Sequence, residues 1–212
     1  MFITFEGIDG CGKTTQHRLF VEWLRNEGAP VVAIKEPGGT PGGEEIRKLL
    51  LDTKPPFNTR AMTLLFNVAR AQLTKDVILP AIDNGNFLVA DRFYDSTLAY
   101  QAYADNQDRQ FVYDLCKYAC YGVEPDLTFF LDVPVETALD RIGTRAKDNI
   151  ESRGAPYLMK VQEGFLQLRD MFPDRFVHIK GFSSVQEVHE TVKLLFKQAA
   201  IARGAWQRWE FY

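Results

Sequence analysis

The sequence has no large excess of either charge and no long hydrophobic run. Its 212 residues contain 25 Lys and Arg against 28 Asp and Glu, a formal net charge of −3. This balance predicts no basic surface for nucleic acid or an anionic membrane. No stretch approaches the roughly 20 apolar residues that cross a bilayer, and Met1–Glu6 lacks the basic start of a secretion signal. We therefore expect a cytoplasmic protein that binds neither a nucleic acid polymer nor a membrane.

Cysteine is also scarce in this chain. Cys11, Cys116 and Cys120 are the only three, and they form neither an even disulfide framework nor paired metal-binding motifs. Cys116 and Cys120 are spaced by one helical turn beside Tyr and Leu, which favours ordinary burial over a metal site. We interpret all three as reduced thiols.

Short β-rich runs alternate with longer helical patterns along nearly the whole chain. This alternation is typical of an α/β fold in which crossover helices cover both faces of a parallel sheet. With 46% hydrophobic residues, the chain can form one domain, 1–212, with a sizeable core. The predicted strands are Phe2–Glu6, Val31–Glu36, Asn86–Asp91, Leu127–Val133 and Phe176–Lys180. We interpret the polar segment at about 143–154 as a mobile lid, and we expect the aromatic end, 206–212, to pack against the fold or a subunit partner.

A glycine-rich phosphate-binding motif, the P-loop, follows the first predicted strand. Gly7–Thr14 satisfies G-x-x-x-x-G-K-[ST] between an apolar strand and an amphipathic helix, and this context argues against a chance glycine-rich turn. Backbone N–H groups and the helix N-terminus suit phosphate oxygens, Lys13 suits the β- and γ-phosphates, and the Thr14 hydroxyl suits Mg²⁺. The pattern predicts binding of a nucleoside triphosphate with magnesium. The residues predicted to hold it are Gly7, Ile8, Asp9, Gly10, Cys11, Gly12, Lys13, Thr14 and Thr15.

The third predicted strand ends in a carboxylate and a guanidinium, Asp91 and Arg92. The carboxyl edge of a parallel sheet is where such folds form their binding crevice. We predict that Asp91 holds Mg²⁺ through water and that the planar fork of Arg92 binds an acceptor phosphate. An exposed ion pair is the alternative, which the P-loop on a neighbouring strand disfavours.

Three motifs in the same order and spacing resemble bacterial thymidylate kinase. They are Phe5–Gln16, Glu36–Thr40 and Asp91–Phe93 with Ser96 and Ala99–Gln101. The similarity runs almost end to end. It implies a three-layer P-loop fold with five parallel strands in the order 2-3-1-4-5, flanked by helices. It also implies a homodimer that uses ATP and Mg²⁺ to phosphorylate dTMP, giving dTDP and ADP in dTTP biosynthesis.

The resemblance further implies an acceptor site. Phe66 would stack on the thymine ring and Arg70 would hydrogen-bond a base carbonyl, although without the family we would interpret them as a core residue and a solvated residue. Tyr100 would pack against the deoxyribose and leave no room for a 2′-hydroxyl, with a packed helix face as the alternative. The residues implied to bind the acceptor are Glu36, Pro37, Phe66, Arg70, Arg92, Ser96, Thr97, Tyr100 and Gln101.

The resemblance places Asp9, inside the P-loop, beside the reacting phosphates. A loop-shaping aspartate is the alternative, but an acidic group in a phosphate cradle is electrostatically costly unless a cation pairs with it. The residues implied to take part in catalysis are Asp9, Lys13, Arg92, Arg141 and Arg145.

Two of these residues are close to the predicted lid: Arg141 stands just before it and Arg145 within it. The variable positions of the P-loop contain no arginine, so the similarity points to the bacterial subgroup whose lid supplies the catalytic cations. Asn149 stands where relatives commonly carry an arginine in Asp-Arg-x-Glu. Lys147 and Arg153 are the candidates to replace that arginine, and the alternative is that Arg145 alone carries its task.

Two other functions fit parts of the sequence. A deoxynucleoside kinase shares the P-loop and the strand-end Asp-Arg pair, but its neutral acceptor gives Arg92 no phosphate to bind. A nucleotide-dependent switch shares the P-loop alone, and the Asn-Lys-x-Asp base-reading motif of GTPases is missing. Neither function explains Phe66, Arg70 and Tyr100 together.

Overall fold

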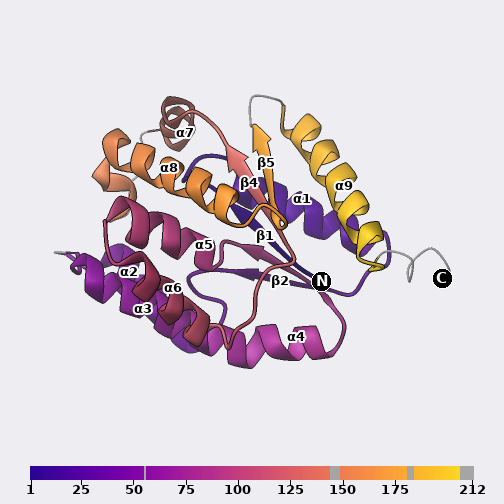
Figure 1. Ribbon diagram of the computed structural model, residues 1–212, viewed down its shortest axis with the longest axis horizontal. Helices are drawn as coiled ribbons and strands as arrows, with labels where there is room; N and C mark the ends of the chain where they lie inside the picture. Colours follow the sequence, from indigo (N-terminus) through magenta and orange to yellow (C-terminus); the bar gives the residue numbers. More distant parts are fainter. Residues whose placement is uncertain (55, 144–148, 181–183, 206–212) are drawn as a thin grey trace.

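The computed structural model describes residues 1–54, 56–143, 149–180 and 184–205. Its centre is a five-stranded parallel sheet with the strand order β2-β3-β1-β4-β5 (Figure 1), as predicted. The strands are β1 Phe2–Glu6, β2 Val31–Lys35, β3 Phe87–Asp91, β4 Leu127–Asp132 and β5 Phe176–Lys180. The predictions for β1 and β5 agree in full, and those for the other three strands are one residue too long.

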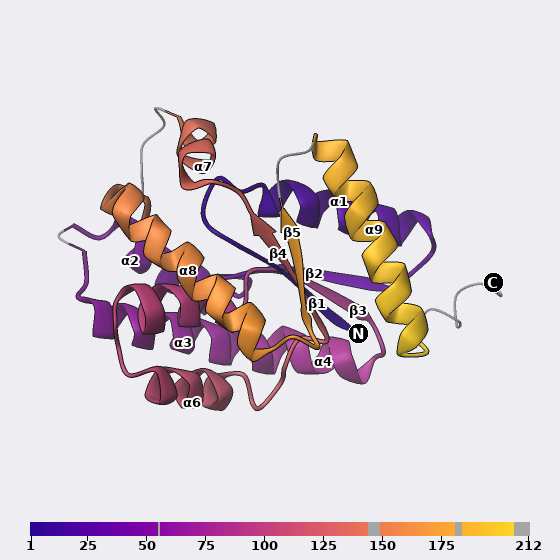
Figure 2. The same ribbon diagram turned by 45° about the horizontal axis from the view of Figure 1, so that its top comes forward.

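Helices cover both faces of the sheet. In Figures 1 and 2, α1 and α9 lie together on one face, and α3, α4, α6 and α8 lie on the other. The α-helices are α1 Lys13–Asn26, α2 Pro41–Asp52, α3 Thr59–Leu73, α4 Leu79–Asp83, α5 Tyr94–Thr97, α6 Arg109–Ala119, α7 Val135–Ile142, α8 Ala155–Met171 and α9 Val185–Ala202. Two π-helical segments, Thr74–Ile78 and Leu98–Ala104, continue α3 and α5, and Glu151–Arg153 forms a 3-10 turn.

The core lies on both sides of the central strands because a parallel sheet is buried on both faces. Every residue of β1 and β3 is buried. An aromatic cluster joins the sheet to α1 and α9: the Phe5 ring lies 5.6 Å from Phe20, and Phe20 lies 5.0 Å from Phe196. This packing holds the carboxyl ends of β1 and β3 side by side, where the P-loop and Asp91 begin the functional site.

Part of the predicted lid lies within the described residues. Gly143 follows α7, and the chain from Asn149 passes through the 3-10 turn into α8. Arg145, Lys147 and the aromatic end 206–212 lie outside the described residues. The role of this segment as a lid stays a prediction. No helix in the described ranges has both the length and the apolar character of a membrane span.

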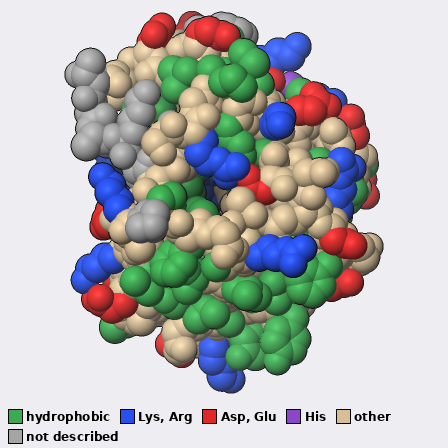
Figure 3. Space-filling model, turned by 90° about the vertical axis from the view of Figure 1, so that its left-hand side faces the viewer, with side chains coloured by type: hydrophobic (Ala, Val, Ile, Leu, Met, Phe, Trp, Pro, Cys, Tyr) green, Lys and Arg blue, Asp and Glu red, His purple; other side chains and the backbone are tan. Residues whose placement is uncertain are grey.

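Large hydrophobic side chains are exposed on two neighbouring helices. On the face drawn in Figure 3 they gather over the lower half, the level at which Figure 1 places α3 and α6. On α3 these include Leu64 and Val68, which are 52% and 55% exposed, and on α6 they include Phe111 and Tyr118.

Candidate active site

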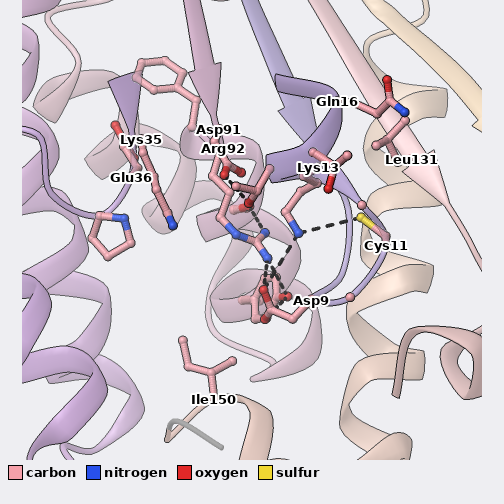
Figure 4. Close-up of a pocket in the computed structure, with 18 of the residues that line it drawn as sticks. Asp9, Cys11, Lys13, Gln16, Lys35, Glu36, Asp91, Arg92, Leu131 and Ile150 are labelled. Carbon is pink, nitrogen blue, oxygen red and sulfur yellow. Dashed lines mark hydrogen bonds and ion pairs between the residues drawn. The ribbon is translucent and has the colours of Figure 1, made fainter. Parts of the chain in front are cut away.

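One cavity of about 610 Å³ opens at the carboxyl edge of the sheet. Of the predicted site residues that the structure describes, all except Gly7 and Ile8 line it. Figure 4 shows the side chains of Lys13, Asp9 and Arg92 converging there, with Glu36 on the other side of Arg92 from Lys13. The predicted residues that line the cavity are Asp9, Gly10, Cys11, Gly12, Lys13, Thr14, Thr15, Glu36, Pro37, Phe66, Arg70, Asp91, Arg92, Ser96, Thr97, Tyr100, Gln101 and Arg141.

The P-loop is shaped by close backbone approaches. A Cβ at Gly7, where φ is +140°, would lie 2.6 Å from the Leu131 carbonyl oxygen, so glycine is required there. Ile8 is buried and contributes its carbonyl, which accepts a 2.8 Å hydrogen bond from Lys13 Nζ. Among the described residues no side chain caps the N-terminus of α1, and its first turn carries no acidic residue. Its backbone N–H groups are therefore available to an anion.

Thr14 and Asp91 place two oxygen atoms of the kind that ligate metals beside the P-loop. The Thr14 hydroxyl donates to Asp91 Oδ2 at 2.6 Å. Within the described ranges there is no cluster of three or more His, Cys, Asp and Glu that could hold a metal. Mg²⁺ needs no such cluster, because it commonly uses one or two protein oxygens together with substrate phosphates and water. The hydroxyl–carboxylate pair fits this requirement.

Arg92 has a strained backbone conformation, and its guanidinium forms several hydrogen bonds. Its φ of 75° lies in the left-handed region, which is uncommon for a residue other than glycine and is often retained at functional sites. Its Nη1 donates to the Gly7 carbonyl at 2.9 Å and to Ser96 Oγ at 2.7 Å, and its Nη2 donates to Asp9 Oδ1 at 2.6 Å. The guanidinium thus joins the P-loop to α5.

Asp9 is surrounded by groups that favour its charged form. Burial by itself raises the pKa of its carboxyl, but Arg92 and Lys13 outweigh burial, so the pKa of Asp9 lies well below its usual range. The Tyr100 hydroxyl donates to Asp9 Oδ2 at 3.2 Å, and Lys13 Nζ lies 3.8 Å from Oδ1. Asp9 is therefore ionised at neutral pH and orients two cations.

Glu6 is a second carboxyl at this edge, and our sequence analysis did not select it as a site residue. It is fully buried and accepts hydrogen bonds from the Phe93 amide at 2.7 Å and from Ser96 Oγ at 2.6 Å. Burial, with a contribution from Asp95, raises the pKa of Glu6 from 4.5 to about 8, although Arg92 lowers it. An acidic residue at the end of a buried strand, next to a P-loop, was the available signal.

Replacing Glu6 with glutamine should change how the free energy of unfolding depends on pH. Below pH 4.5 the carboxyl is protonated in both states, and its contribution to stability is fully present. Between about 4.5 and 8 the unfolded chain releases a proton that the folded chain retains, so wild-type stability falls as pH rises. Urea unfolding from pH 5 to 8.5 should show this fall, on the order of a few kcal/mol, relative to Glu6→Gln. Parallel stability curves for the two proteins would refute this assignment.

A buried ion pair forms the other part of the cavity. Arg70 donates from Nε and Nη2 to Glu36 Oε2 at 2.9 and 2.7 Å. Its Nη2 also donates to Thr97 Oγ1 at 2.9 Å and its Nη1 to Asn67 Oδ1 at 3.0 Å. Arg70 is 2% exposed, so it is not the solvated residue that its neighbours in the sequence suggested.

Glu36 Oε1 is buried and has no hydrogen-bond partner among the described residues. Burial raises the pKa of the Glu36 carboxyl, although Arg70 lowers it. A cis peptide bond joins Glu36 to Pro37, and the Pro37 carbonyl accepts a 2.7 Å hydrogen bond from Arg47 Nη1. Phe66, which is half-buried, lines the same cavity from α3.

Several other residues that line the cavity were not predicted from the sequence. Gln16, Lys35, Arg47, Leu51, Ile150, Val185 and Val188 contribute to the cavity from α1, β2, α2, the segment before α8, and α9. None of them stands in a motif quoted for the resemblance except Gln16. The participation of the other six depends on how distant elements pack, so no local signal indicated it.

Arg141, just before the predicted lid, and Asn149 and Arg153 within it have different surroundings. Arg141 lines the cavity, and its Nη1 donates to the Cys11 carbonyl at 3.4 Å. Arg153 does not line it. Instead, Arg153 pairs with Asp105 at 2.5 Å and lies 3.4 Å from the centroid of the Tyr157 ring. Asn149 Nδ2 donates to two backbone carbonyls near the end of α2.

Comparison with known proteins gives consistent matches across this site. A family model described as thymidylate kinase matches residues 5–192, a range that contains every residue lining the cavity. The thymidylate kinase of Kosmotoga olearia is 42% identical over 193 residues, 91% of this chain and 93% of that protein. That of Thermosipho melanesiensis is 44% identical over 193 residues, 91% and 96% of the two chains.

The solved structures include a similar protein. The crystal structure of thymidylate kinase from Ehrlichia chaffeensis superposes with a TM-score of 0.74 at 33% sequence identity. The match covers 92% of this chain and 97% of that chain. Both the P-loop and the Glu36–Arg70 pair lie in the range that the family model matches.

Proposed function

Because this chain belongs to the thymidylate kinase family, we propose that it transfers the γ-phosphoryl group of ATP to dTMP, forming ADP and dTDP. The observation that carries the proposal is the continuity of the cavity, in which Arg92 lies between Lys13 of the P-loop and Glu36 (Figure 4). Phosphoryl transfer depends chiefly on the alignment of two substrates and on charge stabilisation. One cavity that contains both the P-loop and the side chains of Phe66 and Arg70 suits that task.

The P-loop side is proposed to hold ATP. The backbone N–H groups at the start of α1 bind the phosphates, and Lys13 exchanges its contact with the Ile8 carbonyl for phosphate oxygens. Thr14 and Asp91 are proposed to hold Mg²⁺, Asp91 through water. When bound, the metal offsets negative charge on the phosphate oxygens.

The other side is proposed to hold dTMP. Phe66 stacks on the thymine ring, and Arg70, held by Glu36 and Thr97, hydrogen-bonds a base carbonyl. Tyr100, whose ring lies 5.3 Å from the Arg92 guanidinium, packs against the deoxyribose. Pro37, Ser96, Thr97 and Gln101 complete this part of the pocket.

Arg92 is proposed to bind the acceptor phosphate. An oxygen of that phosphate forms a bond to the γ-phosphorus as the bond from the γ-phosphorus to the β–γ bridging oxygen breaks, and ADP leaves with the electron pair. Lys13 and Arg141 present positive charge to the transferring group, and Arg145 is proposed to do so as well. Asp9 keeps Arg92 and Lys13 oriented.

The decisive experiment compares acceptors. ADP production from ATP and Mg²⁺ is measured with dTMP, dUMP, CMP, thymidine or no acceptor. We expect strong turnover with dTMP and only background without an acceptor, because Arg92 and Arg70 provide sites for a phosphate and for a pyrimidine base. Turnover only with thymidine would indicate a deoxynucleoside kinase. ADP release independent of any acceptor would indicate a nucleotide-dependent switch.

The chain is also proposed to form a homodimer. The exposed side chains of Leu64, Val68, Phe111 and Tyr118 on α3 and α6 are candidates for the contact, because large apolar patches commonly mark protein interfaces (Figure 3). A sedimentation mass equal to one chain at micromolar concentration would contradict this assignment. A cytoplasmic location stays a prediction from the sequence.

A further inference from the structure

A distant side chain caps the C-terminal end of α2. The last carbonyls of a helix lack partners within the helix, and the last turn of α2 carries no basic residue. Asn149 Nδ2 donates to the Leu50 carbonyl at 3.2 Å and to the Thr53 carbonyl at 3.0 Å. The carboxamide of Asn149 thus provides the donors that the end of α2 lacks.

The turn that begins at Asn149 is attached to the body of the protein at both ends. The Asn149 carbonyl accepts a hydrogen bond from Ser152 Oγ at 3.0 Å, and the Ile150 carbonyl accepts one from the Arg153 amide at 3.1 Å. Arg153 then pairs with Asp105. Asn149 therefore connects a compact turn, itself anchored through Arg153, to the end of α2.

The residues next to these contacts line the same cavity as Phe66, which is proposed to stack on the thymine ring. Leu51 follows Leu50 on α2, and Ile150 follows Asn149; both are half-buried and line the cavity with Phe66. Figure 4 shows Ile150 below Asp9 at the edge of this space. The helix α2 packs against α3, which carries Phe66 and Arg70. A shift of α2 therefore affects the acceptor pocket more directly than it affects the P-loop.

We propose that Asn149 is a positioning residue for acceptor binding. Its carboxamide holds the end of α2 against the turn before α8 and so sets the positions of Leu51 and Ile150 around the acceptor. This role is assigned to the N–H donors of the neutral carboxamide, which form both hydrogen bonds. This inference rests on the proposed function, since the acceptor in question is dTMP.

The test removes the donors while keeping the shape of the side chain. Asn149→Asp presents oxygens to the Leu50 and Thr53 carbonyls, and we expect the KM for dTMP to rise roughly tenfold, the order of one or two lost hydrogen bonds. The KM for ATP should not change, and kcat should stay within about threefold. Asn149→Gln, which retains the donors, should recover part of the loss. Asn84→Asp is the matched control, because Asn84 is an exposed residue that follows α4.

A second measurement reports directly on the C-terminal end of α2. Hydrogen exchange of the backbone amides near 50–53 should be faster in Asn149→Asp than in wild type or Asn84→Asp. An unchanged KM for dTMP together with unchanged exchange would overturn the proposal. A large fall in kcat with an unchanged KM would also overturn it, because Asn149 would then act in the transfer step. Failure of the wild-type protein to use dTMP would instead contradict the proposed function, so the two failures are distinguishable.

Discussion

Arg92→Ala should lower kcat/KM for dTMP by about 10³-fold, which is the order seen when a cation that binds a transferring or acceptor phosphate is removed. The guanidinium joins Gly7, Asp9 and Ser96 through hydrogen bonds of 2.6 to 2.9 Å. Its loss removes the acceptor-phosphate ligand and leaves Asp9 without its nearest cation. Steady-state kinetics with dTMP varied at saturating ATP measures the effect, and the KM for ATP should change little.

One further variant, with a matched control, separates charge from geometry at Arg92. Arg92→Lys keeps the positive charge but loses the planar fork, so we expect it to recover only part of the activity. Arg18→Ala is the matched control, because Arg18 is exposed on α1, pairs with Glu22 and does not line the cavity. It should behave as wild type. An Arg92→Ala enzyme within about threefold of wild type would refute the role of Arg92 as acceptor ligand.

Glu36→Ala should lower the free energy of unfolding by roughly 3 to 5 kcal/mol, because it leaves a buried guanidinium without its counter-charge. Arg70 and Glu36 are 2% and 4% exposed, and both hydrogen bonds from Arg70 to Glu36 end on Oε2. Thr97 and Asn67 cannot supply the missing negative charge. Urea unfolding monitored by circular dichroism measures the change.

A variant that removes both partners identifies the cause of this loss. Replacing both partners, Glu36→Gln with Arg70→Met, should cost much less than Glu36→Ala, because no buried charge remains unpaired. The double variant should bind dTMP more weakly than wild type, because it lacks Arg70, the proposed ligand of the base. Glu45→Ala, which breaks an exposed pair with Lys48, should leave the unfolding midpoint nearly unchanged. A Glu36→Ala protein as stable as the Glu45→Ala control would contradict the role assigned to the buried pair.

The fold and the phosphate site were largely predictable because their signals are local. The five predicted strands agree with the structure to within one residue, since runs of buried residues bounded by breakers identify strands of a parallel sheet. Gly7 and Lys13 have positions required by the spacing of one motif. The strand order required the family resemblance in addition, because alternation of strands and helices is compatible with several orders.

The acceptor side of the site was less predictable. Arg70 follows Ala69 on an amphipathic helix and has the sequence character of a surface residue, yet it is buried against Glu36 from another part of the chain. Glu6 stands at the end of a buried strand next to the P-loop, but nothing near it or near Asn149 in the sequence indicates a partner in Ser96 or at the end of α2. In each case the partner is distant in the sequence, so the contact exists only after the sheet and its helices have packed.

By itself, the amino-acid sequence determined the parallel α/β architecture, the strand positions and the phosphate-binding loop, because these follow from periodicity and from glycine and lysine at fixed spacing. Only the tertiary structure decided that Arg92 is held by Asp9, Gly7 and Ser96, that Arg70 is buried on Glu36, and that Asn149 caps α2. These contacts join segments 34 or more residues apart, apart from the Arg92–Ser96 hydrogen bond. The position of each group therefore depends on the packing of whole elements, and the residues next to it in the sequence do not indicate that position.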